Sequence, residues 1–138
     1  MKTKLNKILL IDDSEADNYI HSRVIKKADV TEEIIIKYGA AEALEYLNTK
    51  EGEDYPNPDL IFLDINMPGM NGWDFLEEYK KLGKERRKGV VVCMLSTSAL
   101  EVEQENIEKY NIIESYSQKP LTKEALEHII QRVHPEKI

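Results

Sequence analysis

The chain has 138 residues and a mass of 16.0 kDa, enough for one ordinary domain with a proper core and too little for two. Its composition, 41% hydrophobic and 33% charged, argues against the fibrous and disordered classes. A net charge of −7 argues against nucleic acid as a partner, because nonspecific binding depends on Lys and Arg that neutralise phosphates. We therefore expect a single domain over residues 1–138.

The first apolar run, Ile8 to Ile11, is far shorter than a signal-peptide core or a membrane span. We expect a cytoplasmic protein with no membrane partner. The single cysteine, Cys93, cannot form an internal disulfide, and its apolar neighbours predict a small core residue rather than a reactive thiol. The histidines lie in polar or terminal settings without ligand spacing, and we predict that three are solvated: His21, His128 and His134.

Apolar residues recur along the chain in two patterns. Short continuous runs are typical of strands buried on both faces, and spacings of three and four indicate amphipathic helices. In chain order these patterns predict a strand over 8–11, a helix over 15–27, a strand over 34–36, a helix over 40–48, a strand over 60–64, a helix over 75–82, a strand over 90–95, a helix over 102–110, a strand over 112–118 and a helix after Thr122. This alternation predicts a three-layer, doubly wound (βα)5 α/β fold with a five-stranded parallel sheet and right-handed crossovers.

The segments between these elements carry weaker patterns. Residues 49–59 hold Gly and Pro among charges and predict a solvated loop. Gly83 is a suitable helix stop, and the basic run 84–88 after it is also interpreted as a solvated loop. The predicted helix over 102–110 has few apolar positions, so we expect it to be loosely held.

Polar residues follow four of the predicted strands where each strand ends. Asp12 and Asp13 follow the first strand, Asp64 ends the third, Ser96 follows the fourth and Lys119 follows the fifth. Because the carboxyl ends of parallel strands share one edge of the sheet, we expect these side chains to gather there. Asp12-Asp13 alone is more often a cap than a metal site, Lys119-Pro120 alone only ends a strand, and Ser96 alone is explained as a capping hydroxyl. Their joint occurrence at strand ends favours a site.

Three carboxylates at one edge repel each other and require a positive charge. Their hard oxygen ligands, without a His or Cys cluster, favour Mg²⁺. A metal beside a lysine and a hydroxyl suits a phosphoryl group. Asp64 is then either a metal ligand only, or also a nucleophile that attacks phosphorus and becomes an acyl phosphate. Its fixed position at the strand end favours the second role.

The chain resembles the receiver domains of two-component response regulators, of the stand-alone type, over nearly its full length. The resemblance rests on a set of short motifs: Asp12-Asp13, Asp64 with the following Met67-Pro68-Gly69-Met70-Asn71-Gly72, Ser96, Lys119-Pro120, and Tyr116 at the position of the family's switch aromatic residue. The resemblance implies a CheY-like, flavodoxin-like fold.

By this resemblance, Asp64 is the phosphoacceptor and takes its phosphoryl group from a phosphohistidine of a sensor histidine kinase or a phosphotransfer protein. Mg²⁺ would be bound by Asp13, Asp64 and the backbone carbonyl of Asn66, while Asp12 helps through water. The phosphoprotein would then be a phosphorylation-controlled signalling module.

The resemblance also implies a switch. Ser96 and Lys119 would bind phosphoryl oxygens, and Ser96 would vacate space that Tyr116 fills. The Lys119–Pro120 bond is a candidate cis peptide. A downstream protein would bind the surface of the fourth helix, fifth strand and fifth helix, with the chain as a monomer or as a phosphorylation-dependent dimer; a phosphoryl relay is the other output.

Two features depart from the family pattern. Thr97 is larger than the Ala or Gly often found there, and would narrow access to the phosphoryl group and alter the lifetime of the phosphorylated state. The loop over 49–59 is longer than usual.

Three other functions compete with this interpretation. A Mg²⁺-dependent phosphatase or phosphotransferase commonly has a second acid two residues after its aspartyl nucleophile, where this chain has Asn66. A flavodoxin-like cofactor carrier would have a Gly, Ser or Thr-rich phosphate loop where this chain has Asp12 and Asp13. The complete set of site residues disfavours an inactive docking domain. We expect no enzyme, but a module that assists its own phosphorylation and dephosphorylation.

Overall fold

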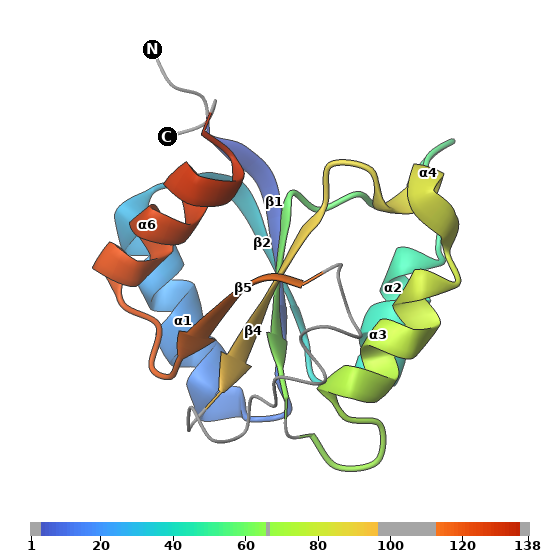
Figure 1. Ribbon diagram of the computed structural model, residues 1–138, viewed down its shortest axis with the longest axis horizontal. Coiled ribbons are helices and arrows are strands. Elements are labelled where there is room, and N and C mark those ends of the chain that lie inside the picture. The colour runs from blue at the N-terminus through green and yellow to red at the C-terminus, as the bar shows by residue number, and fades with distance from the viewer. Residues whose placement is uncertain (1–3, 66, 97–112, 136–138) are drawn as a thin grey trace.

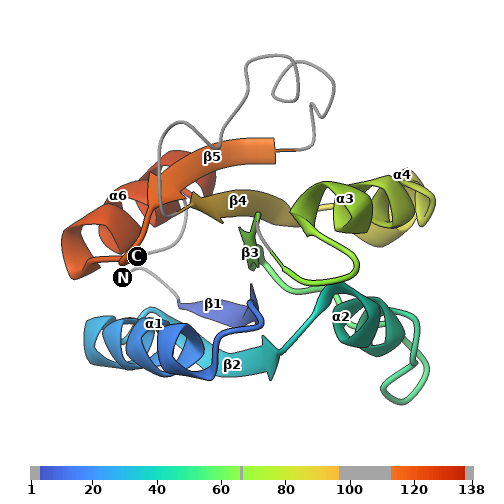
Figure 2. The same cartoon turned by 90° about the horizontal axis from the view of Figure 1, so that it is seen from below.

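The computed structural model describes residues 4–65, 67–96 and 113–135. Five parallel strands form one sheet in the order β2-β1-β3-β4-β5, an order that is visible from bottom to top in Figure 2. The strands are β1 (Leu5–Ile11), β2 (Thr31–Lys37), β3 (Leu60–Asp64), β4 (Val91–Ser96) and β5 (Ile113–Gln118). The described helices are α1 (Glu15–Ala28), α2 (Ala40–Leu47), α3 (Gly72–Lys80), α4 (Gly83–Arg87) and α6 (Lys123–Val133).

Helices cover both faces of the sheet, with α1 and α6 on one side and α2, α3 and α4 on the other (Figure 1). The predicted three-layer, doubly wound fold with a parallel sheet is therefore confirmed. The predicted helix over 102–110 lies outside the described residues.

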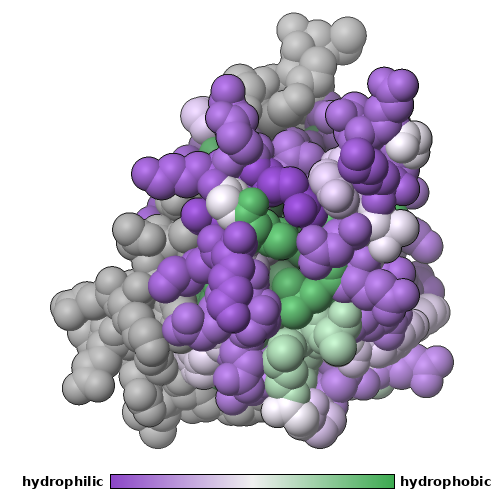
Figure 3. All heavy atoms as spheres, turned by 90° about the vertical axis from the view of Figure 1, so that its right-hand side faces the viewer, coloured by the Kyte–Doolittle hydropathy of each residue, from purple (hydrophilic) through white to green (hydrophobic). Residues whose placement is uncertain are grey.

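Side chains of the central strands alternate between two hydrophobic cores. In β3, Ile61 and Leu63 pack on the side of α2 and α3, while Leu60 and Phe62 pack on the side of α1 and α6. All five residues of β3 are buried, which explains why its sequence is a continuous apolar run rather than an alternating pattern. The outer face formed by α2, α3 and α4 is largely hydrophilic, apart from a hydrophobic strip near its centre (Figure 3).

Side-chain caps fix where three helices begin. Ser14 Oγ accepts a hydrogen bond from the Asp17 N–H at 3.1 Å, and Thr122 Oγ1 accepts one from the Ala125 N–H at 3.1 Å. Both caps were expected from the sequence. Asn71 adds a capping box at α3, where the side chains of Asn71 and Asp74 each accept from the other's backbone N–H. The first turn of each helix is thus held close to the end of the preceding strand.

The solvated loop predicted for residues 84–88 is wrong for most of its length, because residues 83–87 form the short helix α4. Lys, Glu and Arg are good helix formers, and Gly83, at φ +84°, makes the turn that separates α4 from α3. A five-residue helix has no apolar stripe, so the sequence pattern alone could not reveal it.

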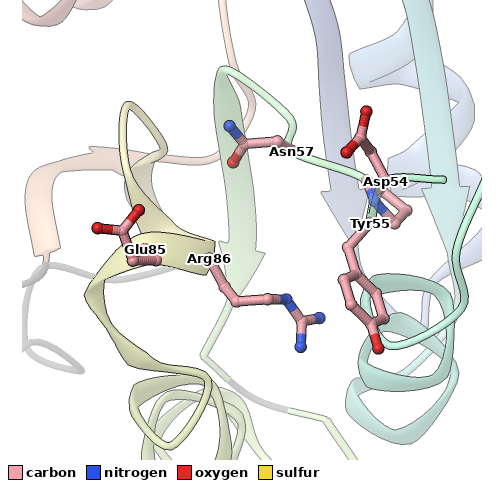
Figure 4. A pocket seen from close by; sticks show the side chains of 6 residues that line it. Asp54, Tyr55, Asn57, Glu85 and Arg86 are labelled. Atoms are coloured by element: carbon pink, nitrogen blue, oxygen red, sulfur yellow. The ribbon is translucent and has the colours of Figure 1, made fainter.

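The solvated loop predicted for residues 49–59 is only partly correct, because Pro56 and Pro58 are buried and the loop packs against α4. The guanidinium of Arg86 lies 3.7 Å from the centre of the Tyr55 ring and donates to the backbone carbonyl of Leu47. Tyr55, Pro56 and Arg86 are among the residues that line a cavity of about 400 Å³ between the loop and α4 (Figure 4). Because the loop precedes β3, this cavity lies at the amino-terminal edge of the sheet.

The predicted exposure of His21 and His134 is also wrong, since both side chains are buried. His21 lies on the inner face of α1, where burial and the nearby Lys119 lower its pKa. His134 Nε2 lies 2.8 Å from the carbonyl oxygen of Asp59. His128 is exposed and Cys93 is buried, as predicted, and burial raises the pKa of Cys93 to about 12.

Among residues 4–65, 67–96 and 113–135, no helix is long and apolar enough to cross a membrane.

Candidate functional site

The carboxylates of Asp12, Asp13 and Asp64 gather at the carboxyl edge of the sheet, with ligand oxygens within 4.8 Å of one another. The β1–β3 register pairs Ile11 with Leu63, so the next residues along the two strands, Asp12 and Asp64, lie side by side. Asp12 and Asp64 are only 2% and 5% exposed, whereas Asp13 is exposed. The site therefore has a buried base and an open side.

Lys119 supplies the positive charge at this edge. Its Nζ lies 2.7 Å from Asp12 Oδ2, 3.0 Å from Asp17 Oδ2 and 3.1 Å from Asp64 Oδ1. The Lys119 N–H donates to the carbonyl of Ser96 at 2.7 Å, which holds the end of β5 against the end of β4. The Lys119–Pro120 peptide bond is cis. The ammonium of one largely buried lysine side chain thus contacts three carboxylates.

Burial and the neighbouring Asp12 raise the pKa of Asp64 to about 6, although Lys119 acts in the opposite direction. Burial by itself would lower the pKa of Lys119, but its hydrogen bonds to Asp12 and Asp17 raise that pKa above its ordinary value. Lys119 is therefore held as a cation, while Asp64 ionises at a cost that a further cation in the site would offset.

The predicted switch residues come from the neighbouring strands β4 and β5. Ser96 is the last residue of β4, is buried, and follows Leu95, which pairs with Asp64. Tyr116 in β5 pairs with Met94 and packs against the core on the side of α2 and α3. Its hydroxyl is buried and has no hydrogen-bond partner among the residues that the structure describes, and burial raises the pKa of Tyr116 to about 12. Such a hydroxyl is not tied to its present position.

Asn66, predicted to offer its backbone carbonyl to a metal, and Thr97, predicted to narrow access to the site, lie outside the described residues. The remaining ligands fit Mg²⁺, because the group contains only carboxylate oxygens. Asp12, Asp13 and Asp64 are the residues of this chain that would hold the ion.

Sequence reasoning missed two residues of α1 that complete the site. Asp17 is the third carboxylate on Lys119. Asn18, 1% exposed, donates from Nδ2 to the Asp12 carbonyl at 2.8 Å. The Ser14 N–H also donates to Asp12 Oδ1 at 2.9 Å. These contacts orient Asp12 before any ligand binds.

Gly72 allows α3 to begin directly beside the site. A Cβ atom added to Gly72 would lie 2.6 Å from the carbonyl oxygen of Asp64 and 3.0 Å from Ile65 Cα. The Gly72 N–H donates to the Ile65 carbonyl at 2.9 Å. A side chain at this position would displace the backbone that carries Asp64.

The family model for the response regulator receiver domain matches residues 8–131. The chain therefore belongs to the response regulator receiver domain family. It is 37% identical to the response regulator Rcp1 of a Synechocystis species over 90 residues, which cover 64% of this chain and 61% of Rcp1. It is 28% identical to a probable methanogenesis regulatory protein, FilR2, of Methanothrix harundinacea, over 91% of this chain and 79% of that protein.

A solved structure supports the same assignment. The crystal structure of a two-component response regulator from Cytophaga hutchinsonii superposes with a TM-score of 0.81 at 30% identity, and the match covers 94% of this chain and 97% of that one. The matched part of Rcp1 is less than two thirds of that protein, so this chain is similar to a part of Rcp1 and not to its whole length.

Proposed function

We propose that this receiver domain accepts a phosphoryl group on Asp64 from a phosphohistidine of a sensor histidine kinase or a phosphotransfer protein. The observation that carries the proposal is the position of Asp64. The residue is 5% exposed, and its carboxylate lies 3.1 Å from the Lys119 ammonium and within 4.8 Å of carboxylate oxygens of Asp12 and Asp13. This is an arrangement in which one oxygen can attack while the charge around it is balanced.

In the proposed transfer, an Asp64 oxygen attacks phosphorus, the bond from phosphorus to the histidine nitrogen breaks, and the electron pair stays on that nitrogen. The product is an acyl phosphate on Asp64. Lys119 would donate a hydrogen bond to a phosphoryl oxygen, and Asp12, Asp13 and Asp64 would hold the metal. Mg²⁺, when bound, neutralises charge on the phosphoryl oxygens and on the carboxylates.

The proposed output is a change of a protein-binding surface or a relay of the phosphoryl group to another protein. Tyr116 and Ser96 are the switch residues, supported by the buried hydroxyl of Tyr116, which has no hydrogen-bond partner within residues 4–65, 67–96 and 113–135. The surface includes β5 and α6, and it would bind a downstream target. The domain assists its own phosphorylation and dephosphorylation and acts on no external substrate. Family membership also supports a cytoplasmic location.

The test is to incubate the protein with Mg²⁺ and a small acyl phosphate, and to measure its intact mass. We expect one phosphoryl group on the wild type, none on Asp64→Asn and none when the metal is chelated. Asp54→Asn is the matched control, because Asp54 is an exposed aspartate in the loop at the opposite edge of the sheet. Equal phosphorylation of Asp64→Asn and wild type, or no phosphorylation of the wild type, would refute the proposal.

A further inference from the structure

The three N–H donors of the Lys119 ammonium already face three carboxylates. Its Nζ lies 2.7 Å from Asp12, 3.0 Å from Asp17 and 3.1 Å from Asp64, and its side chain is 10% exposed. An ammonium has three donors and no more. A phosphoryl oxygen can therefore gain a hydrogen bond from Lys119 only if one of these three contacts is given up.

The three contacts differ in how firmly each carboxylate is held. The Asp12 side chain is 4% exposed, and its other oxygen accepts from the Ser14 N–H at 2.9 Å. Asp64 is the group that becomes the acyl phosphate, so it stays at the reacting centre. The Asp17 side chain is 35% exposed and lies in the first turn of α1, where water can replace its contact with Lys119.

We infer that Asp17 is a positioning residue that competes with the incoming phosphoryl group for Lys119. Asp17 holds Lys119 at the resting site, and it releases the ammonium when the phosphoryl oxygens arrive. The inference rests on the proposed function for the phosphoryl group, while the Asp17–Lys119 contact itself is a feature of the resting structure. Two consequences follow: Asp17 slows phosphorylation, and phosphorylation frees the first turn of α1 from the end of β5.

The direction of the effect comes from charge and from donor count. Asp17 adds a negative charge beside the position that a doubly charged phosphoryl donor must approach. It also occupies a donor that the transferring group needs. Replacing Asp17 by Asn keeps the shape of the side chain and removes the charge. The competing contact becomes a neutral hydrogen bond, which is weaker.

The experiment compares initial phosphorylation rates of wild type, Asp17→Asn and Glu15→Gln at a subsaturating concentration of acetyl phosphate with Mg²⁺. Glu15 is an exposed acid in the same helical turn, so its variant removes the same charge without contact to Lys119. We expect Asp17→Asn to react roughly fivefold faster, the effect of one partly exposed charged hydrogen bond, and Glu15→Gln to stay within about twofold of the wild type.

Two further measurements separate this role from a merely structural one. In a Lys119→Ala background, Asp17→Asn should give no more acceleration than Glu15→Gln. In the unphosphorylated protein, the ¹⁵N resonance of Lys119 Nζ should shift in Asp17→Asn and stay in place in Glu15→Gln. An acceleration that persists without Lys119 would overturn the competition, as would an unchanged resonance.

The failures of the two proposals are distinguishable. If the wild type and both variants gain no phosphoryl group, the proposed function is refuted and the competition with it. If the wild type is phosphorylated on Asp64 but Asp17→Asn reacts at the same rate or more slowly, only the competition is refuted. A slower reaction would show that Asp17 prepares Lys119 for transfer instead of withholding it.

Discussion

Replacing the phosphoacceptor candidate by its neutral analogue, in Asp64→Asn, is expected to stabilise the metal-free protein at neutral pH. Burial and Asp12 raise the pKa of Asp64 from its ordinary value of 3.8 to about 6. A carboxyl group whose pKa is higher in the folded than in the unfolded state stabilises the fold while it is protonated, and this stabilisation is lost as the pH rises through the folded pKa. Asn resembles the protonated carboxyl and avoids the loss.

The magnitude follows from the two pKa values. The interval from 3.8 to about 6, at about 1.36 kcal/mol per pH unit, gives an advantage of about 3 kcal/mol for the variant at pH 7. Near pH 4.5 the folded carboxyl is still protonated, and the same linkage gives the variant a stability advantage of only about 1 kcal/mol.

The assay is urea unfolding of wild type and Asp64→Asn in chelator at both pH values, with Asp54→Asn as the control. The control should match the wild type at both pH values, because Asp54 is exposed in the loop at the opposite, amino-terminal edge of the sheet. Adding Mg²⁺ should reduce the advantage of Asp64→Asn at pH 7, because the ion binds and stabilises the native carboxylates. A variant no more stable than wild type at pH 7, or equally favoured at pH 4.5, would refute the reasoning.

Three other substitutions test the site and the loop. Lys119→Ala should leave Mg²⁺ binding largely in place, measured by titration calorimetry, and remove the NMR response of β5 to phosphorylation. Gly72→Ala should lower the unfolding free energy by about 2 kcal/mol and slow phosphorylation, because its Cβ would meet the Asp64 carbonyl at 2.6 Å. Arg86→Met should cost about 1 kcal/mol in urea unfolding by freeing the Tyr55 loop, while the exposed Lys84→Met costs nothing measurable.

The fold could be predicted because hydrophobic periodicity is a local signal that the tertiary structure preserves. The runs 8–11 and 60–64 became central strands, and the helices predicted after Ser14 and Thr122 begin at these caps. The failures have local causes as well. The helix α4 is too short to show an apolar stripe. The contact of Arg86 with Tyr55 joins two segments that are distant in the sequence, and no local pattern indicates it.

The polar inner face of α1 is the part of the site that could have been predicted from the sequence but was missed. Along β1, Ile8 and Leu10 face α1 and α6, and the period of two continues to Asp12. Along β3, Leu60 and Phe62 face the same side, and the period continues to Asp64. Both buried carboxylates are thus directed toward the helix that follows β1.

The direction of these two carboxylates explains why α1 has polar residues at inner positions, beyond the one that caps the helix. Asp17, Asn18 and His21 are polar where an amphipathic helix would be apolar, and all three lie within the first two turns, next to the carboxylates. An apolar side chain at Asn18 would leave the Asp12 carbonyl without its 2.8 Å hydrogen bond. A hydrophobicity pattern would predict that this polar face of α1 is exposed to solvent, but in the structure it lines the site. Polar residues at the inner positions of a first helical turn, after a strand that ends in carboxylates, are the sequence feature that would have identified Asp17.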